Sequence, residues 1–306
     1  MLTSNIYLYL LLLLVTKIMY SEGNLCSCSQ PDSDFATGIN LIYYKCNNET
    51  PATIAYPITA PQELLKVLED KRTILYIFGY LENPTDENSQ VMIKALCNGR
   101  TDNIVLLDWS KHSDGFYWSV FENAKKVGSL FAQSIRLLKN NNFNISNIYI
   151  VAHSLGAHIA GFVGKCNNFT LPRITALDPA NPFIYPLGCY LKSTDASWID
   201  VIHTDMGRYG TLTHMGTAEY FANGGTRPQP GCKPFGIPLS QTDLCSHKRS
   251  VKIYAESKLH PIEFTAINCS SYEEYDNNKC KNNLHVNVGY AALNVTGLFY
   301  FTTGTL

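Results

Sequence analysis

One stretch, residues 147–161, constrains the fold of this chain more than any other. It begins with an apolar, β-branched run at 148–151, which is the pattern of a strand buried inside a parallel sheet. A short segment that contains Ser154 follows, and small residues then recur at helical spacing from Ala157 to Gly161. The pattern predicts a strand, a sharp turn and a helix, with Ser154 at the turn. A serine here also has a purely structural use, because its hydroxyl can cap the first turn of the helix.

A strand, a turn and a helix with serine at the apex form the arrangement called the nucleophile elbow, which is typical of the α/β-hydrolase fold. The backbone of Ser154 would be strained there, so the residues two before and two after it must be small. These residues are Ala152 and Gly156. The usual motif has glycine at both places, and Ala152 departs from it by one methyl group.

The composition is that of a globular protein. Of the 306 residues, 45% are hydrophobic and 16% are charged, which provides enough apolar material for a large core. The formal net charge of -1 gives no reason to expect a nucleic acid partner. No repeat or low-complexity linker divides residues 24–306, and we interpret them as one domain.

The N-terminus and the cysteines both indicate secretion. Residues 1–23 are interpreted as a signal peptide, because an apolar run at 6–15 precedes the small residues Ser21 and Gly23. No basic residue precedes the run, and an uncleaved membrane anchor is the alternative. All ten cysteines lie after residue 23, and an even number is typical of a disulfide framework in a secreted chain. We therefore predict an extracellular protein.

Glycosylation sequons agree with this location. They start at Asn48, Asn144, Asn168, Asn268 and Asn294. The sequon at Asn268 has Cys269 in its middle and is the least suited to modification, which leaves the other four as candidates.

Strand patterns alternate with helical patterns along the chain, and several of the strands end in Gly, Asp or Ser. The predicted strands are 39–44, 73–78, 103–108, 173–177 and 199–204, and the predicted helices are 61–70, 88–97 and 116–139. This alternation predicts an α/β protein with a central, mostly parallel sheet flanked by helices. Functional groups should lie at the carboxyl ends of the strands.

A serine nucleophile needs a base, an acid that orients the base, and donors for the oxyanion. In α/β-hydrolases the acid follows the serine in the chain and the histidine comes last. Asp178 ends the next strand after Ser154, which places it at the expected edge of the sheet. The sequence leaves five candidates for the base: His203, His214, His247, His260 and His285.

Among these candidates, His247 is favoured by its neighbour Cys245, since a disulfide there would hold the loop in place. His203 lies in an apolar strand and is better explained as a structural, hydrogen-bonding histidine. Rival acids remain, although carboxylates in loops usually serve as caps and turns. They are Asp195, Asp200 and Asp205.

Backbone amides are the expected oxyanion donors. One belongs to Leu155, directly after Ser154, and the other to Tyr80, in the loop after an early strand. Loss of one such donor would raise the reaction barrier by about 3 kcal/mol.

These motifs together resemble the pancreatic lipase family, which includes triacylglycerol lipases, phospholipases A1 and insect members without a lid. The segment 151–161, Val-Ala-His-Ser-Leu-Gly-Ala-His-Ile-Ala-Gly, is one match. The others are 77–80, 105–109, 176–180, 200–205, 220–225, 229–232 and 245–247. The resemblance implies a catalytic domain over 24–306 with Ser154, Asp178 and His247 as its triad and no cofactor. It also implies Tyr80 and Leu155 as the oxyanion donors.

Three features depart from the family pattern. Phe78 stands where the family usually has a histidine before the oxyanion glycine. At the positions of the pancreatic lipase calcium site only Asp195 remains an acid, and Lys192 replaces one ligand, so we expect no metal. The chain leaves no room for the family's C-terminal β-sandwich domain after the catalytic domain, so we expect no colipase partner.

The resemblance also implies a disulfide between Cys232 and Cys245 that brackets a lid, and a second between Cys269 and Cys280. The lid loop, 233–244, has only 12 residues, and the segment 206–217 is also short. In this family, two shortened loops accompany phospholipase A1 activity, as in the wasp venom members, because an open site admits a polar head group.

The expected activity is therefore hydrolysis of the sn-1 ester of phospholipids at a membrane or lipid interface. The alternatives within enzymes are a triacylglycerol (neutral) lipase and a galactolipase. From another class, a non-catalytic, yolk-type lipid-binding protein also fits the resemblance.

Overall fold

The computed structural model describes residues 26, 28, 33–47, 51–181 and 189–306. Within these residues, no helix has both the length and the apolar character needed to cross a bilayer. The signal peptide expected over 1–23 and the sequon at Asn48 lie outside the described residues.

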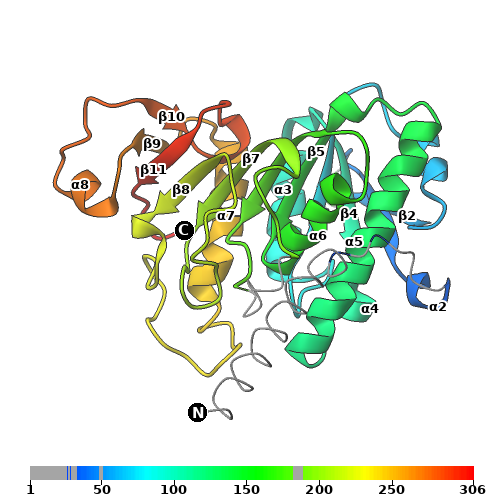
Figure 1. The fold of residues 1–306 in the computed structure, drawn as a ribbon, viewed down its shortest axis with the longest axis horizontal. Helices are drawn as coiled ribbons and strands as arrows, with labels where there is room; N and C mark the ends of the chain where they lie inside the picture. Colours follow the sequence, from blue (N-terminus) through cyan, green and yellow to red (C-terminus); the bar gives the residue numbers. More distant parts are fainter. Residues whose placement is uncertain (1–25, 27, 29–32, 48–50, 182–188) are drawn as a thin grey trace, which may run out of the picture.

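The fold is built on one sheet of eleven strands, in the order β10-β9-β11-β8-β7-β6-β5-β3-β4-β1-β2 (Figure 1). The strands are β1 (Asn40–Lys45), β2 (Ala52–Pro57), β3 (Thr73–Ile77), β4 (Asn103–Asp108), β5 (Ile148–His153), β6 (Leu171–Leu177), β7 (Ala196–His203), β8 (Ala218–Ala222), β9 (Thr265–Asn268), β10 (His285–Asn287) and β11 (Gly297–Phe301). Neighbours from β4 through β11 run parallel, and antiparallel pairs occur only at the two edges, among the strands described. This is the predicted central, mostly parallel sheet.

Helices cover both faces of the sheet. The α-helices are α2 (Ser33–Ala36), α3 (Glu87–Cys97), α4 (Ser110–Ser113), α5 (Tyr117–Asn140), α6 (Leu155–Lys165), α7 (Cys245–Leu259) and α8 (Tyr272–Asp276). Short 3₁₀ helices are η2 (Pro61–Lys66), η3 (Asn98–Arg100), η4 (Ile145–Asn147), η6 (Asn223–Gly225) and η7 (Gly289–Ala291). Helix α5 packs on α6, α3 packs on α7, and the sheet lies between these two pairs (Figure 1). The architecture is the α/β-hydrolase fold.

Among the strands that were predicted from the sequence, those at the centre of the sheet have mostly buried side chains. Every residue of β3 and β5 is buried, as expected of parallel strands covered on both faces. In contrast, β2 is exposed along almost its whole length and shows no apolar pattern. The helix predicted over 61–70 is only the 3₁₀ helix η2, which buries Pro61 and Leu64 and ends when Val67 N–H donates to Leu64 O. The predicted strands did not include β2 or β8 to β11.

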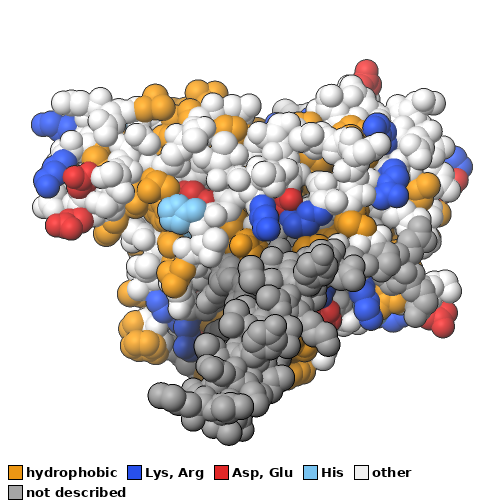
Figure 2. All heavy atoms as spheres, in the orientation of Figure 1, with side chains coloured by type: hydrophobic (Ala, Val, Ile, Leu, Met, Phe, Trp, Pro, Cys, Tyr) orange, Lys and Arg blue, Asp and Glu red, His pale blue; other side chains and the backbone are white. Residues whose placement is uncertain are grey.

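All ten cysteines are paired. The disulfides are Cys26–Cys189, Cys28–Cys166, Cys46–Cys97, Cys232–Cys245 and Cys269–Cys280. The last two are the pairs that the family resemblance implies. On the face drawn in Figure 2, basic and acidic side chains form small scattered groups, in keeping with the net charge of -1.

Candidate active site

Strand β5 leads into helix α6 through a single residue, Ser154. Its φ of 55° and ψ of -122° are strained for a residue with a Cβ. The turn is tight, because a Cβ on Gly156 would lie 2.4 Å from the carbonyl oxygen of Ile77. Ala152 is fully buried opposite Ile77 and Ala176 on the neighbouring strands, so its extra methyl group fits within the sheet.

A continuous chain of hydrogen bonds, which we call the relay, joins Ser154, His247 and Asp178. Ser154 makes no capping bond to α6, and its Oγ lies 2.8 Å from His247 Nε2. His247 Nδ1 lies 2.6 Å from Asp178 Oδ2. A carboxylate at Nδ1 keeps the imidazole proton on that nitrogen, which leaves Nε2 to accept the proton of the serine hydroxyl. The arrangement can therefore activate Ser154 as a nucleophile.

Separate elements bring these three side chains together. Asp178 follows β6 with a φ of 42°, and its Oδ1 accepts hydrogen bonds from the amides of Thr204 (2.9 Å) and Asp205 (3.1 Å) after β7. His247 lies in the first turn of α7, two residues after the disulfide-bonded Cys245. The two amide donors fix one carboxylate oxygen of Asp178, so its other oxygen is held toward His247.

Two rival acids are engaged elsewhere. Asp200 accepts two hydrogen bonds, at 2.8 and 3.0 Å, from the guanidinium of Arg173. Asp195 forms an ion pair with Lys165 and accepts the Lys192 amide at 2.8 Å. Asp195 is the one acid that this chain retains at the positions of the family's calcium site, and its carboxylate is paired with the Lys165 amine.

The third rival, Asp205, lies close to the relay but pairs with Arg227. Both Arg227–Asp205 contacts measure 2.6 Å, and the same guanidinium reaches Asp243 at 2.9 Å. Burial raises the pKa of Asp205, and the bond from Arg227 offsets only part of this effect. Asp205 donates its amide to Asp178 and, through Arg227, is linked to Asp243 near the end of the loop 233–244.

The other histidines have structural partners. His203 Nε2 lies 2.5 Å from Glu219 inside the sheet, which is the structural use expected for it. His214 lies against the Phe221 ring, with 5.9 Å between ring centroids, and His260 and His285 lie on the surface. His158 Nε2 lies 2.9 Å from the Ala180 carbonyl, and burial lowers its pKa to about 4, so this ring stays neutral.

The turn after β3 passes directly beside Ser154. A Cβ on Gly79 would lie 2.6 Å from Ser154 Cβ, so only glycine fits there. Tyr80 follows, and its hydroxyl donates to Gly115 O at 2.7 Å. Leu155 begins α6, where helix geometry leaves the first amides without a partner inside the helix. The two expected oxyanion donors therefore lie on the two segments that adjoin Ser154.

Phe78, which precedes this turn, makes apolar contacts in place of the histidine usual in the family. It is fully buried and stacks on Trp109 with 5.8 Å between ring centroids. Its carbonyl accepts a 3.0 Å hydrogen bond from Trp109 Nε1. Ring stacking and the hydrogen bond from Trp109 together hold the end of β3.

Glu82 is a site residue that sequence analysis did not identify. It is 2% exposed, and its Oε2 accepts the Gly79 amide at 2.6 Å and contacts His153 Nδ1 at 2.9 Å. Burial acts to raise the pKa of Glu82, but the interaction with His153, the nearby charge of Lys248 and the hydrogen bond from the Gly79 amide outweigh it and bring the pKa to about 2. The only sequence signal was a carboxylate three residues after a glycine, which also describes an ordinary turn cap.

A cavity of about 270 Å³ opens at Ser154. Apolar and aromatic side chains form much of its wall: Tyr80, Leu81, Tyr117, Tyr209, Leu239 and Leu244. Arg208 and Lys248 line the same cavity, and neither forms an ion pair with a carboxylate among the described residues; the Lys248 amine donates to Gln241 at 3.3 Å. The site is an apolar pocket with two cations in its wall, beside a hydrogen-bonded serine.

The loop 233–244 contributes one wall of this cavity. Its Leu239 lines the cavity, while Phe235 and Ile237 are each 79% exposed. Asp243 anchors the end of the loop by accepting hydrogen bonds from Arg227 and from the Tyr209 hydroxyl. The short loop therefore borders the site and keeps two large apolar side chains in contact with solvent.

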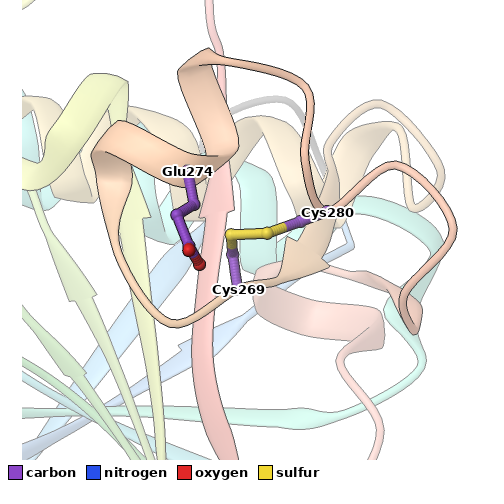
Figure 3. Close-up of side chains that lie close together, drawn as sticks. All are labelled: Cys269, Glu274 and Cys280. Carbon is purple, nitrogen blue, oxygen red and sulfur yellow. A yellow bond between two sulfur atoms is a disulfide. The ribbon is translucent and has the colours of Figure 1, made fainter.

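Two groups of side chains have metal-ligand spacing in the part of the chain that the structure describes. One consists of Asp178, Asp205 and His247, whose atoms already form the relay and the Arg227 pair. The other consists of Cys269, Glu274 and Cys280, and Figure 3 shows its two sulfur atoms bonded to each other. That disulfide leaves only the Glu274 carboxylate as a ligand.

The sheet, the elbow and the relay define an α/β-hydrolase, and comparison with known proteins gives its family. Residues 31–298 match the sequence model of the family described as Lipase. Lipase member H of Danio rerio is 36% identical over 214 residues, which cover 68% of this chain and 46% of that protein. Pancreatic triacylglycerol lipase of Myocastor coypus is 32% identical over 266 residues, or 79% of this chain and 58% of that one.

Inactive pancreatic lipase-related protein 1 of Canis lupus familiaris is 35% identical over 260 residues, which cover 78% of this chain and 55% of that protein. The chain spans about half the length of these relatives. It belongs to the pancreatic lipase family of the α/β-hydrolase superfamily, and the resemblance found in the sequence is confirmed.

Proposed function

We propose that this protein is a secreted serine esterase that hydrolyses the sn-1 fatty-acyl ester of phospholipids. The observation that carries the esterase assignment is the relay, with 2.8 Å between Ser154 Oγ and His247 Nε2 and 2.6 Å between His247 Nδ1 and Asp178. The lipase family of the chain supports a carboxylic ester as the substrate.

The proposed reaction has two steps. Ser154 Oγ attacks the ester carbonyl while His247 Nε2 takes the hydroxyl proton, and the amides of Tyr80 and Leu155 bind the resulting oxyanion. Asp178 stabilises the imidazolium. His247 then gives its proton to the leaving lysophospholipid alcohol, and the acyl group remains on Ser154. Water, deprotonated by His247, releases the fatty acid and restores the serine.

Two features of the cavity support a phospholipid rather than a neutral glyceride. Arg208 and Lys248 line it without an ion pair to a carboxylate among the described residues, and a phosphate group would complement both charges. The short lid loop, 12 residues from 233 to 244, leaves space for a polar head group. The apolar part of the wall suits the acyl chain.

A second candidate, hydrolysis of neutral glycerides, is favoured by the relative named pancreatic triacylglycerol lipase. Galactolipid hydrolysis also fits the apolar wall. A non-catalytic lipid-binding role is the third candidate, since another relative is named inactive. A serine-reactive phosphonate separates the third from the others, because absence of labelling at Ser154 in folded protein supports binding alone.

Secretion is supported by the five disulfides, which are typical of oxidising compartments. The sequon asparagines at 144, 168 and 294 are exposed. Asn268 is half-buried, and its side-chain amide donates to Leu298 O at 3.1 Å, which agrees with its exclusion as a glycosylation site.

The experiment that tests the function compares phosphatidylcholine, triolein and a galactolipid as substrates of the full chain. We expect release of the sn-1 fatty acid from phosphatidylcholine at the highest kcat/KM. The double variant Arg208→Gln, Lys248→Gln should lose about tenfold on phosphatidylcholine and little on triolein. Lys252→Gln is the matched control, because Lys252 lies one turn further along α7, pairs with Glu87 and does not line the cavity. Triolein hydrolysis without phospholipid hydrolysis rejects the proposed specificity.

A further inference from the structure

The turn that carries Tyr80 has a strained backbone and is held by contacts from outside it. Leu81 has a φ of 58°, which is unfavourable for a residue with a branched side chain. Its amide donates to Ser113 O at 2.9 Å, and Ser113 Oγ donates to Glu82 O at 2.8 Å. The conformation of the turn therefore depends on neighbouring segments.

Glu82 joins this turn to the nucleophile elbow. One carboxylate oxygen, Oε2, contacts both the Gly79 amide at 2.6 Å and His153 Nδ1 at 2.9 Å. Gly79 immediately precedes Tyr80, and His153 immediately precedes Ser154. A single buried oxygen atom thus bridges the two segments that carry the expected oxyanion amides.

The same contacts set the direction of the Tyr80 amide. The Gly79 carbonyl accepts from the Glu82 amide at 3.4 Å, and in a trans peptide the following N–H points the opposite way. The bridge fixes one end of Gly79 and the turn bond fixes the other. Together they determine the position and the orientation of the peptide group between Gly79 and Tyr80.

We propose that Glu82 is a positioning residue. Its carboxylate holds the Tyr80 amide in the position and orientation from which this amide and the Leu155 amide can both bind the oxyanion. This inference rests on the proposed esterase function. Glu82 acts through its partners, because its side chain bonds to Gly79, His153 and Asn88, none of which belongs to the relay.

A carboxylate suits this position better than an amide of the same size. The Gly79 amide and the Asn88 side-chain amide, 3.3 Å from Oε1, are both donors, and His153 Nδ1 donates to a carboxylate as well. Charge-assisted hydrogen bonds are also shorter and stronger than neutral ones. In Glu82→Gln the new NH₂ group must face one of these donors, which breaks part of the bridge.

The test compares Glu82→Gln with the wild-type chain on a soluble short-chain ester. We expect kcat to fall by about 10- to 100-fold and KM to change less than threefold, because the ester still binds but its oxyanion loses a well-placed donor. Asp86→Asn is the matched control. Asp86 lies in the same loop, accepts the Asn83 amide at 2.8 Å and should leave kcat unchanged. An unchanged kcat in folded Glu82→Gln, or an equal fall in both variants, overturns the inference.

The pH dependence of kcat/KM provides a readout that a merely structural role would not move. The ring of His153 lies 4.7 Å from the ring of His247, so Glu82→Gln removes a buried negative charge near the base. The imidazolium of His247 loses stabilisation, and the acid limb should shift to lower pH. The other titratable groups that face His247 are Asp178, Asp205, Tyr209 and Lys248, which the substitution leaves in place, and His153, which loses its carboxylate partner.

Titration with the phosphonate counts the reactive sites in each preparation and separates the possible failures. A folded wild-type chain that neither reacts nor hydrolyses any ester overturns the proposed function and this inference with it. An active wild type with an unaffected Glu82→Gln overturns the inference alone. If Glu82→Gln does not accumulate as folded protein, Glu82→Asp keeps the charge on a shorter side chain. It should lose kcat while the acid limb stays in place, and retention of full kcat there would also overturn the inference.

Discussion

Two buried carboxylate–imidazole pairs lie beside Ser154, and they differ in what the second imidazole nitrogen meets. His247 holds Asp178 at 2.6 Å through Nδ1 and meets Ser154 Oγ at 2.8 Å through Nε2. His153 holds Glu82 at 2.9 Å through Nδ1, but its Nε2 has no hydrogen-bond partner among the described residues. The same two chemical groups therefore form a relay in one place and a tether in the other.

The difference follows from the secondary-structure elements that carry the two histidines. His153 is the last residue of β5, so the strand that presents Ser154 also fixes its ring against Glu82. His247 comes from α7, a separate element, and a disulfide two residues earlier in the chain holds that element in place. His153, although next to Ser154 in sequence, is thus less free to reach the Ser154 hydroxyl than His247, which comes from a distant segment. Four predictions test this comparison.

The largest expected effect is on the relay imidazole. His247→Gln removes the base and should lower kcat by about 10⁴- to 10⁶-fold. His153→Gln should cost only about 10- to 100-fold, because it loosens a tether without removing a proton acceptor from Ser154. Steady-state kinetics on a soluble ester measure both. Equal losses in the two variants would show that the pairs do not have different roles.

The next effect concerns the two acids. Asp178→Asn should lower kcat by about 10⁴-fold, because an amide no longer holds the imidazole in the required tautomer. The isosteric change at the other pair, Glu82→Gln, should cost far less. Both variants are measured by kcat after active-site titration. A smaller loss in Asp178→Asn than in Glu82→Gln contradicts the assignment of Asp178 to the relay.

A third prediction concerns stability. The pKa of Glu82 in the folded protein, about 2, lies below its ordinary value of 4.5, so its ionisation stabilises the fold above pH 4.5. That contribution, on the order of 3 kcal/mol, should be lost as the pH falls from 4.5 to 2. Urea unfolding measures the difference in unfolding free energy between wild type and Glu82→Gln. We expect it to be constant above pH 5 and to shrink toward pH 2, and a difference that does not change with pH contradicts the prediction.

The smallest expected effect comes from adding a methyl group at Gly79, in the turn that the Glu82 carboxylate holds. In Gly79→Ala the new methyl group would lie 2.6 Å from Ser154 Cβ, so the turn must shift away from the nucleophile. We expect kcat to fall by about 100-fold and phosphonate labelling to slow in parallel. Gly304→Ala is the control, since no atom lies within 4 Å of the added Cβ. Normal labelling in folded Gly79→Ala would show that the turn tolerates displacement.

Much of the fold and of the candidate site could be predicted where the signal is local. The apolar runs of β3 and β5 are buried on both faces, and so they were visible as continuous hydrophobic segments. Chain order within the fold pointed to Asp178 and His247, and the structure brings both to Ser154. The exposed strand β2 was missed because nothing in its sequence alternates.

Glu82 could not be recognised in the same way. Its neighbours in sequence indicate a turn, and its partner His153 lies 71 residues further along the chain. The short η2 helix shows a similar limit, because its pattern predicted ten residues of helix and the chain ends it at Lys66. In both cases the outcome depends on contacts with segments that the local pattern does not describe.

By itself, the sequence determined the strands of the sheet centre, the elbow at Ser154 and the residue types of the relay. These follow from the periodicity and size of side chains that are neighbours in the chain. Only the tertiary structure decided which imidazole meets Ser154 and that Glu82 bridges two active-site segments. Those contacts join residues 93 and 71 positions apart, and their distances are set by the packing of all the elements between them.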